Sequence, residues 1–335
     1  SLNKGEDLKA ISEDLTLGGK KGDVPFGTLS TIHESDLKFG LLYVGSDDGL
    51  VHVSKDGGNK WENISNGLPT GYWVSRVQAS MHNEATVYVA LNGYRLDDFG
   101  AFLYVSKDYG QTWKRLGTLL PHEPINVVRE DPKNANILYI GTDHGLYVSI
   151  NQGVTFMGMT NNLPAVSVHD LVIHPRDNDL IVGTHGRSIY IANVEHLQQI
   201  TDELLARELT VFKVKKANYR SSWGSIRNVY SKPYEPKRTI PFYSKNANKA
   251  TIKVIYKDMI IKEIKVDAVQ GLNYVDYDLT FDKNVSKYEK ALSSDEQKVK
   301  VKKADNGKRY LKKGAYTIEV LVNESKETTE FKVVK

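Results

Sequence analysis

Acidic, basic and aromatic residues follow short apolar segments at several places within residues 1–207. Arginine and aspartate recognise carboxylates and hydroxyl groups, and aromatic rings line binding pockets, so this combination is typical of a glycan or peptide site. The candidate ligand-binding residues are Asp47, Trp73, Arg76, Arg95, Asp97, Asp98, Asp143, His144, His169, Asp170, His185 and Arg187. Hydrolysis of a glycosidic bond needs two carboxylates about 5–9.5 Å apart. Because a sequence does not set that separation, Asp47, Asp97 and Asp143 stay candidates and the catalytic residues stay unknown.

The same side chains also suit a structural role. Arg76 with Asp97, or Arg187 with Asp143, could form salt bridges between neighbouring repeats. An aspartate within a tight turn commonly accepts hydrogen bonds from the backbone of that turn. A face closed by such arginine–aspartate bridges would favour a binding or scaffold module. Two carboxylates facing each other across an open cleft would favour a hydrolase.

Other chemistries are not expected from this chain. A sialidase needs an arginine cluster and a tyrosine nucleophile; Arg76, Arg129 and Arg187 supply arginines, but no partner tyrosine is recognisable. No H-E-x-x-H or H-x-x-x-H pattern occurs, and the chain has no cysteine. Asp97 and Asp98 alone fall short of the 6–8 oxygen ligands that calcium takes. No metal and no cofactor are therefore expected.

An internal repeat organises residues 1–192. Four apolar segments recur, three of which end in Gly-Ser/Thr, and their equivalent positions are Tyr43, Tyr88, Tyr139 and Ile181. The intervals of 45, 51 and 42 residues match the length of one four-stranded propeller blade. The repeat predicts four consecutive blades over residues 14–192, with innermost strands at 27–33, 73–79, 125–130 and 167–173. Residues 91–100 are expected to form the longest loop, a candidate lid.

A second signature, S-x-D-x-G-x-x-W, follows the apolar pairs. It occurs at residues 54–61 and 106–113, and at 149–156 with Asn for Asp and Phe for Trp. The Asp or Asn side chain accepts backbone N–H bonds across the turn, and Gly supplies a positive φ. These segments, here called box turns, are therefore expected to be folding elements on one face of the blades.

The first residues fit the same signature, with Asn3 for Asp and Leu8 for Trp. The chain is therefore expected to begin in mid-blade, as a piece of a longer propeller or as a strand that completes the last blade. The fourth repeat has no box turn after residues 189–192, so residues 10–12 are expected to pair as an outer strand. Residues 194–206 are expected to form short helices, with Thr201 as an N-cap.

Charge divides the chain into two parts. The formal charge is −8 over residues 1–207 and +12 over 208–335, which together make the net +4. The lysines of the second part alternate with apolar residues, as on the solvent face of strands, so no nucleic-acid partner is expected. Six or seven short strands predict an Ig-like β-sandwich at 208–335, separate from the blades at 1–207. Neither part contains an apolar stretch long enough for a membrane span.

Several segments resemble one family. They are residues 73–77, 94–99, 128–132, 141–149, 168–171 and 183–188, together with the G-L-N-Y-V-D-Y-D-L run at 271–279 and K-G-A-Y at 313–316. With the box turns they resemble the C-terminal part of large bacterial BNR-repeat, sortilin-type propeller proteins, called glycosyl hydrolase-like, that carry an Ig-like module. The resemblance implies an all-β fold, a secreted, periplasmic or cell-surface location, and remaining blades of a parent protein as partners. It implies binding of a glycan or peptide on the face opposite the box turns. The alternative is a glycoside hydrolase whose active site lies partly in missing blades.

Overall fold

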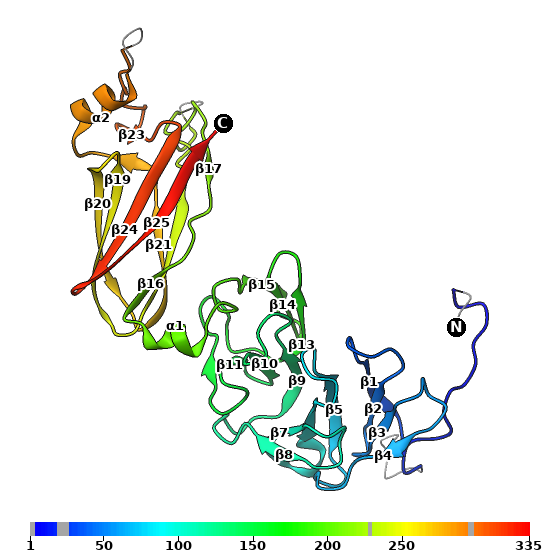
Figure 1. The fold of residues 1–335 in the computed structure, drawn as a ribbon. Helices are drawn as coiled ribbons and strands as arrows, with labels where there is room; N and C mark the ends of the chain where they lie inside the picture. The colour runs from blue at the N-terminus through cyan, green and yellow to red at the C-terminus, as the bar shows by residue number, and fades with distance from the viewer. Residues whose placement is uncertain (1–3, 19–26, 227–229, 294–297) are drawn as a thin grey trace. The chain divides into compact units, whose positions relative to one another are not determined.

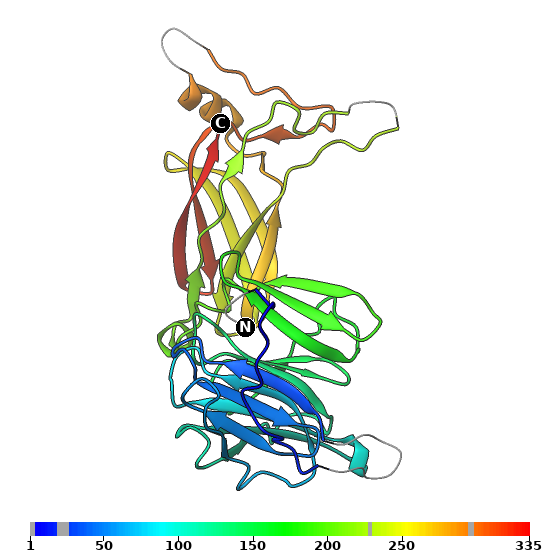
Figure 2. The same cartoon turned by 90° about the vertical axis from the view of Figure 1, so that its right-hand side faces the viewer.

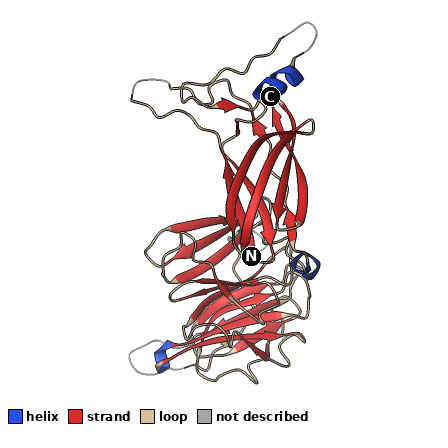
Figure 3. Cartoon of the chain, turned by 90° about the vertical axis from the view of Figure 1, so that its left-hand side faces the viewer, coloured by secondary structure: helices blue, strands red, loops and turns tan. Residues whose placement is uncertain are grey.

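The computed structural model describes residues 4–18, 27–226, 230–293 and 298–335. The chain divides into two compact units, Ser1–Gln199 and Ile200–Lys335. Strands dominate both units (Figure 3). The division falls eight residues before the expected boundary after residue 207. The stretch between belongs with the second unit, where the Tyr243 hydroxyl donates to the carbonyl oxygen of Leu205 at 3.3 Å.

Four antiparallel sheets make up the first unit, and they follow one another along the chain (Figures 1 and 2). The first sheet contains β1 (Leu29–Glu34), β2 (Leu42–Ser46), β3 (Val51–Ser54) and β4 (Glu62–Asn63). The second contains β5 (Trp73–Ala79), β6 (Val87–Gly93), β7 (Asp98–Ser106) and β8 (Lys114–Leu116). The third contains β9 (Ile125–Glu130), β10 (Leu138–Thr142), β11 (Leu146–Ser149) and β12 (Met157–Gly158). The fourth has three strands, β13 (Val168–His174), β14 (Asp179–Thr184) and β15 (Ile189–Asn193).

The cores of this unit lie between the sheets. Tyr43 and Val53 of the first sheet share one core with Val77 of the second. Two further cores join the second sheet to the third and the third to the fourth. The innermost strands β1, β5, β9 and β13 contact each other in that order. Stacked four-stranded sheets with their first strands gathered on one side are the blades of a β-propeller, so we call the sheets blades one to four.

The three box turns have the hydrogen bonds that their sequence predicts. Asp56, Asp108 and Asn151 accept the backbone N–H four residues later, at 2.9 Å in each turn. The serine that opens each turn accepts the N–H of the turn's glycine at 2.7–2.8 Å. Each turn also bonds through its backbone to the loop between the first two strands of its own blade. The three box turns therefore lie at the same end of their blades.

The expected outer strand at residues 10–12 is wrong, because no strand forms there. Instead the segment packs on the first blade, where the Trp61 indole N–H donates to the carbonyl oxygen of Ile11 at 2.8 Å. Trp113 makes the same bond to Ile64 of the first blade, at 2.7 Å. Ile11 thus occupies, against the first blade, the position that Ile64 occupies against the second. The box-like turn expected around Asn3 lies partly outside the described residues.

The long loop expected at residues 91–100 is also wrong. β6 continues to Gly93 and β7 begins at Asp98, so most of the insert is strand. A single 3-10 turn, η1 (Tyr94–Leu96), connects them, and Asp97 closes it with a positive φ of 56°. The insert is thus an extended hairpin rather than a long loop, because Leu91 pairs with Phe102 and Gly93 pairs with Asp98.

The second unit has two sheets around one core. The smaller has the order β16 (Leu209–Val211), β18 (Arg238–Ser244), β21 (Gly271–Tyr277). The larger has the order β17 (Ala217–Asn218), β25 (Ser325–Val334), β24 (Gly314–Val322), β19 (Asn248–Tyr256), β20 (Met259–Ala268). Phe242 of the smaller sheet and Ile252, Ile318 and Phe331 of the larger are fully or almost fully buried in the shared core. A two-stranded ribbon, β22 (Thr280–Phe281) and β23 (Arg309–Tyr310), completes the strands of the described residues.

Two short α-helices occur in the second unit. α1 (Asp202–Ala206) begins after Thr201, whose hydroxyl accepts the N–H of Leu204 at 3.2 Å, so the predicted N-cap is confirmed. Residues 195–199 form turns rather than the expected helix. α2 (Val285–Leu292) lies between β22 and β23 and buries Tyr288.

Candidate functional site

Two arginines from different blades converge on one aspartate. Arg76 on β5 places Nη2 at 2.9 Å from Oδ1 of Asp170 on β13. Arg129 on β9 places Nη2 at 3.5 Å from the same oxygen. The three residues come from the innermost strands of the second, third and fourth blades. Blade stacking therefore builds this group, here called the Arg–Asp cluster, from residues up to 94 positions apart.

Arg129 is held firmly in this cluster. Its Nε donates to the carbonyl oxygen of Leu171 at 2.7 Å, and its Nη1 donates to Oε1 of Gln78 at 3.4 Å. Burial, and then the neighbouring Arg76, lower the pKa of Arg129. Arginine nevertheless keeps its proton in proteins. The cluster therefore contains a permanent cation whose hydrogen-bond donors are largely used by the fold.

Arg76 is less completely satisfied. Its Nη2 also donates to the carbonyl oxygen of His169 at 3.4 Å. Its Nε is buried and has no hydrogen-bond partner among the described residues. Asp170 remains 55% exposed on its side chain. Two guanidinium groups thus share one half-exposed carboxylate as their ion-pair partner, and Asp36 is a second acid whose charge raises the pKa of Arg129.

Histidines border the cluster. Burial, and then Arg129, lower the pKa of His33, and its Nδ1 accepts the N–H of Ala79 at 3.3 Å. The N–H donor of Ala79 and the nearby cations Arg129 and Arg76 favour the neutral imidazole of His33. The rings of His169 and His185 lie with centroids 5.2 Å apart, and both residues are exposed. The predicted residues Arg76, His169, Asp170 and His185 are therefore brought together.

A second group joins the first and second blades. Arg95 places Nη1 at 3.5 Å from Oδ2 of Asp47, and its guanidinium lies 5.1 Å from the ring centre of Trp73. Tyr94 adds a further ring 6.4 Å from that of Trp73. Asp47 also accepts the backbone N–H groups of Gly27 and Thr28, both at 2.9 Å. This group, the Trp73 cluster, combines an aromatic surface with a paired arginine.

The remaining predicted acids bond to their own surroundings. Asp48 accepts the N–H of Leu17 at 2.8 Å. Asp143 accepts an N–H of the Asn126 side chain at 2.8 Å. The Tyr72 hydroxyl and the Gly100 N–H donate to Asp98 and lower its pKa.

The other predicted residues lie at the edges of the blades. Asp97 is exposed at the end of η1, and Arg187 is exposed in the turn between β14 and β15. His144 places Nδ1 at 4.0 Å from Oε1 of Glu123. The pairings considered from the sequence, Arg76 with Asp97 and Arg187 with Asp143, are not among the ion pairs of the described residues; Arg76 pairs with Asp170.

Sequence reasoning left Arg129, Gln78 and His33 out of the candidate site. All three stand at the same register position, three residues after the bulged residue of an innermost strand: Ser30, Ser75 and Asn126 are the bulged residues. A polar or charged residue at one fixed position of successive innermost strands was the available signal. This signal is weak in a single sequence, because polar and apolar residues alternate along these strands in any case.

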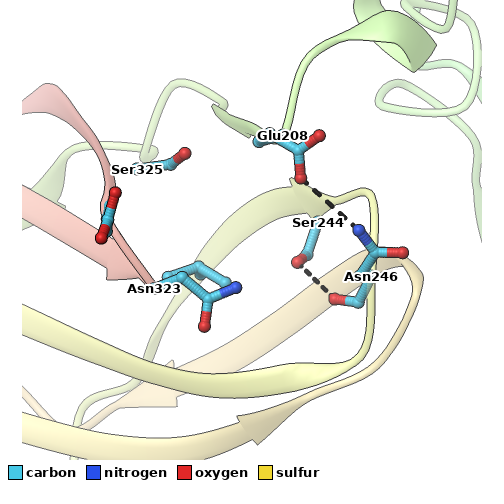
Figure 4. A pocket seen from close by; sticks show the side chains of 7 residues that line it. Glu208, Ser244, Asn246, Asn323 and Ser325 are labelled. Carbon is cyan, nitrogen blue, oxygen red and sulfur yellow. Dashed lines mark hydrogen bonds between the residues drawn. The ribbon is translucent and has the colours of Figure 1, made fainter.

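No group of three histidine or acidic side chains suited to a metal occurs in the part of the chain that the structure describes. No helix of that part is both long and apolar enough to span a membrane. A hollow of about 270 Å³ in the second unit is lined by polar residues (Figure 4). There Ser244 donates to the Asn246 carbonyl oxygen and Lys245 to Glu208, at 2.7 and 3.1 Å. None of the predicted site residues lines it.

Comparison with known proteins gives one family. The Sortilin-Vps10 model, described as "Sortilin, neurotensin receptor 3", matches residues 101–325. No curated protein matches the chain at a significant level.

Solved structures similar to the chain are distant in sequence. The GH74 xyloglucanase from Xanthomonas campestris is 10% identical, with a TM-score of 0.42 over 92% of this chain and 47% of the enzyme. YCF48 from Cyanidioschyzon merolae is 14% identical, with a TM-score of 0.34 over 76% of this chain and 74% of that protein. The extracellular domain of a putative hybrid two-component system from B. thetaiotaomicron is 12% identical, with a TM-score of 0.39 over 92% and 38%. The chain spans about half the length of the xyloglucanase.

Proposed function

Because this chain belongs to the Sortilin-Vps10 family, we propose that its propeller unit is a binding module for an anionic group of a glycan or peptide. The observation that carries the proposal is the Arg–Asp cluster. Arg76 and Arg129 face a single carboxylate, and Nε of Arg76 is buried without a partner. A ligand carboxylate or sulfate can pair with these guanidinium groups, since charge-assisted and bidentate bonds from arginine are strong.

Asp170 serves as the internal competitor for that ligand. Its side chain is half-exposed, whereas the two arginines have side-chain exposures of 23% and 19%. An arriving anion can displace the aspartate into solvent without moving the arginines. The fixed guanidinium groups then lose little conformational freedom on binding, which favours affinity.

The wider candidate surface consists of the two clusters and their borders. Trp73 and Tyr94 offer apolar area beside Arg95, as glycan and peptide sites commonly do. We propose this set as ligand-binding: Asp47, Trp73, Arg76, Arg95, Asp97, Asp98, Asp143, His144, His169, Asp170, His185 and Arg187, with Arg129 added.

Hydrolysis is the weaker of the two functions. A general acid must hold a proton near neutral pH, which requires a raised carboxyl pKa. The pKa of Asp98 is instead lowered by the Tyr72 hydroxyl and the Gly100 N–H. Asp47 and Asp143 each accept two hydrogen bonds or more from nearby groups. Bridged and bonded carboxylates support a binding or scaffold role.

Further blades of a longer propeller are proposed partners of the first unit. Val74, Ile125 and Val168 start the innermost strands of blades two to four, and each is fully buried. Val74 packs against Gly45 and Val168 against Gly141, the small residue of the preceding blade. Leu29 has the equivalent place in blade one but is 43% exposed.

The opposite end of the unit has the complementary feature. Gly183 of blade four is equivalent to Gly45 and Gly141, yet the atoms nearest to the place where its side chain would be belong to Asp170 and lie 3.5–3.9 Å away. Ile189 and Ile191 on the last strand are 70% and 66% exposed. An apolar residue from a following blade would fill the space at Gly183, and a small residue from a preceding blade would receive Leu29. We include an Ig-like second unit and an extracytoplasmic location in the proposal, on the family resemblance.

Binding to glycan and peptide arrays tests the proposed function, with Arg76→Ala compared against Arg176→Ala. Arg176 is an exposed arginine of the same unit, in the turn between β13 and β14, and it pairs only with Asp177. Anionic ligands should be retained by Arg176→Ala and lost by Arg76→Ala while both variants melt like folded proteins. Equal binding by the two variants, or a preference for neutral ligands, would contradict the proposal.

A further inference from the structure

A hollow of about 320 Å³ lies in the second unit, far in sequence from the Arg–Asp cluster. It is formed by the segment after β17, the segment before β23, and the first residues after β23. Its lining consists of Tyr219, Arg220, Ser221, Trp223, Ser225, Lys300, Val301, Lys302, Lys303, Ala304, Tyr310 and Lys312. Ligand sites in proteins have volumes of roughly 300–1,000 Å³, so this hollow can hold a small ligand or one or two sugar rings.

The charge of the lining is one-sided. Five of its residues are lysine or arginine, and none is acidic. Some lysines of the second unit are paired, such as Lys253 with Glu319 at 2.9 Å and Lys262 with Asp282 at 2.6 Å. Among the ion pairs of the described residues, none involves Lys300, Lys302 or Lys303. These ammonium groups therefore have no ion-pair partner within the described part of the chain, and an anion would supply one.

The wall of the hollow is aromatic and firmly packed. Trp223 and Tyr310 are only 4% and 6% exposed, and their ring centres lie 6.1 Å apart. Tyr219 meets Trp223 edge-on at 5.3 Å. Lys312 Nζ donates to the Tyr219 hydroxyl at 2.9 Å, so its ammonium group lies beside this wall. The lysines thus surround aromatic side chains that are packed into the unit.

We propose that this hollow binds a segment of an anionic polysaccharide, through carboxylate or sulfate groups held by Lys300, Lys302 and Lys303. Ring edges and half-buried tyrosine suit the apolar faces of sugars, and lysines act as point charges that do not require planar bidentate geometry. Single-stranded nucleic acid would need open aromatic faces for base stacking. Trp223 and Tyr310 are too buried to offer them. The site lies in a different unit from the proposed propeller site and does not depend on it.

Titration calorimetry of the full chain tests this site at low and physiological salt. The probes are a chondroitin sulfate tetrasaccharide, a polygalacturonate tetrasaccharide, neutral cellotetraose and a single-stranded DNA of matched charge. The test variant is Lys302→Ala/Lys303→Ala. The matched control is Lys249→Ala/Lys265→Ala, which removes two exposed lysines from the β19–β20 hairpin of the same unit.

The sulfated or carboxylated probe should bind, and the test variant should weaken it by about tenfold, as expected for two lost charge-assisted contacts. The control variant, Lys249→Ala/Lys265→Ala, should bind like the unmodified chain. Comparing the two anionic probes distinguishes sulfate from carboxylate. Charge reversal by Lys303→Glu should abolish binding while leaving the melting transition unchanged.

Three outcomes would overturn the inference. The first is that the anionic saccharides bind no better than cellotetraose. The second is an equal loss of affinity in the test and control variants, which would mean unspecific attraction to a basic unit. The third is DNA that binds as tightly as the saccharides and loses affinity in Lys302→Ala/Lys303→Ala, which would assign the hollow to a different class of polymer.

Discussion

The indole N–H of Trp113 in the second blade donates to the carbonyl oxygen of Ile64 in the first blade at 2.7 Å. Trp61 makes the same bond to Ile11, 50 residues before it. Each tryptophan closes a box turn of its own blade and ties that blade to the chain segment before it. The box turn thus has two structural roles: it is stabilised by its own hydrogen bonds, and its tryptophan bonds to the preceding chain segment.

Removing this indole donor should therefore weaken the contact between blades. Trp113→Phe keeps an aromatic ring but leaves the Ile64 carbonyl without that partner, and we expect a loss of about 1–2 kcal/mol in unfolding free energy. Trp61→Phe should cost less, because its bond to Ile11 is exposed to water. Urea denaturation of both variants measures the difference. Identical midpoints for Trp113→Phe and the unmodified protein would show that the bond contributes nothing.

Asp108 should matter to stability and not to binding. Its carboxylate accepts the N–H of Thr112 at 2.9 Å and the hydroxyl of Ser106 at 2.7 Å. Asp108→Ala should cost about 1–3 kcal/mol, whereas Asp108→Asn should cost little, since Asn151 fills the same place in the third blade. Thermal melts give the stabilities, and an array screen at a temperature where both are folded gives the binding. Loss of binding by folded Asp108→Ala would assign the box turn to a ligand site.

Arg95→Ala is expected to lower stability and binding more than a substitution in an exposed loop would. The structure pairs Arg95 with Asp47 and sets it over Trp73. Losing both contacts should cost about 0.5–1 kcal/mol and should also weaken any ligand that uses the Trp73 cluster. Parallel melts and binding isotherms of Arg95→Ala separate the two effects. A variant that melts earlier but binds normally would limit Arg95 to a structural role.

Stability should fall in acid as Asp108 is protonated. Its pKa is lowered from an ordinary value of 3.8 to about 2, chiefly by the Thr112 hydroxyl and then by that of Ser106. A carboxyl group with a lower pKa in the folded state stabilises the fold above its unfolded value and loses this effect as pH falls. We therefore expect the contribution to be present above about pH 4 and lost between about pH 4 and 2. Urea melts across that range should show a shallower pH dependence for Asp108→Asn; an unchanged slope would contradict the assignment.

The equivalent glycines of the blades should differ in what they tolerate. A side chain at Gly141 would lie 2.6–2.7 Å from methyl groups of Val127 and Val168, so Gly141→Val should destabilise by about 1–3 kcal/mol. At Gly183 the nearest atoms belong to Asp170, and they lie 3.5 Å or more from the place of an added side chain. Gly183→Val should therefore be tolerated in this 335-residue chain. In a longer chain that adds a following blade, Gly183→Val should destabilise like Gly141→Val, and tolerance there would refute the proposed blade contact.

Local patterns were read from the sequence with good accuracy. The predicted innermost strands at 73–79 and 125–130 coincide with β5 and β9, and Thr201 caps α1 as expected. The box-turn bonds from Asp56, Asp108 and Asn151 were also predictable. These features depend on residues within a few positions of one another, so the chemistry of the segment decides them.

The contacts between residues that are far apart in the sequence depend on the tertiary structure. In β18, Pro241 interrupts the alternating pattern of a strand, and pairing with β16 and β21 makes the segment a strand. Residues 10–12 lie against Trp61 of the first blade rather than in the fourth blade. The repeat pattern does not say which blade such a segment contacts, so the packing decides it. Arg76 meets Asp170 across 94 positions. Charge and repeat period alone leave many arginine–aspartate pairings open, and only the stacking of blades around their innermost strands selects one.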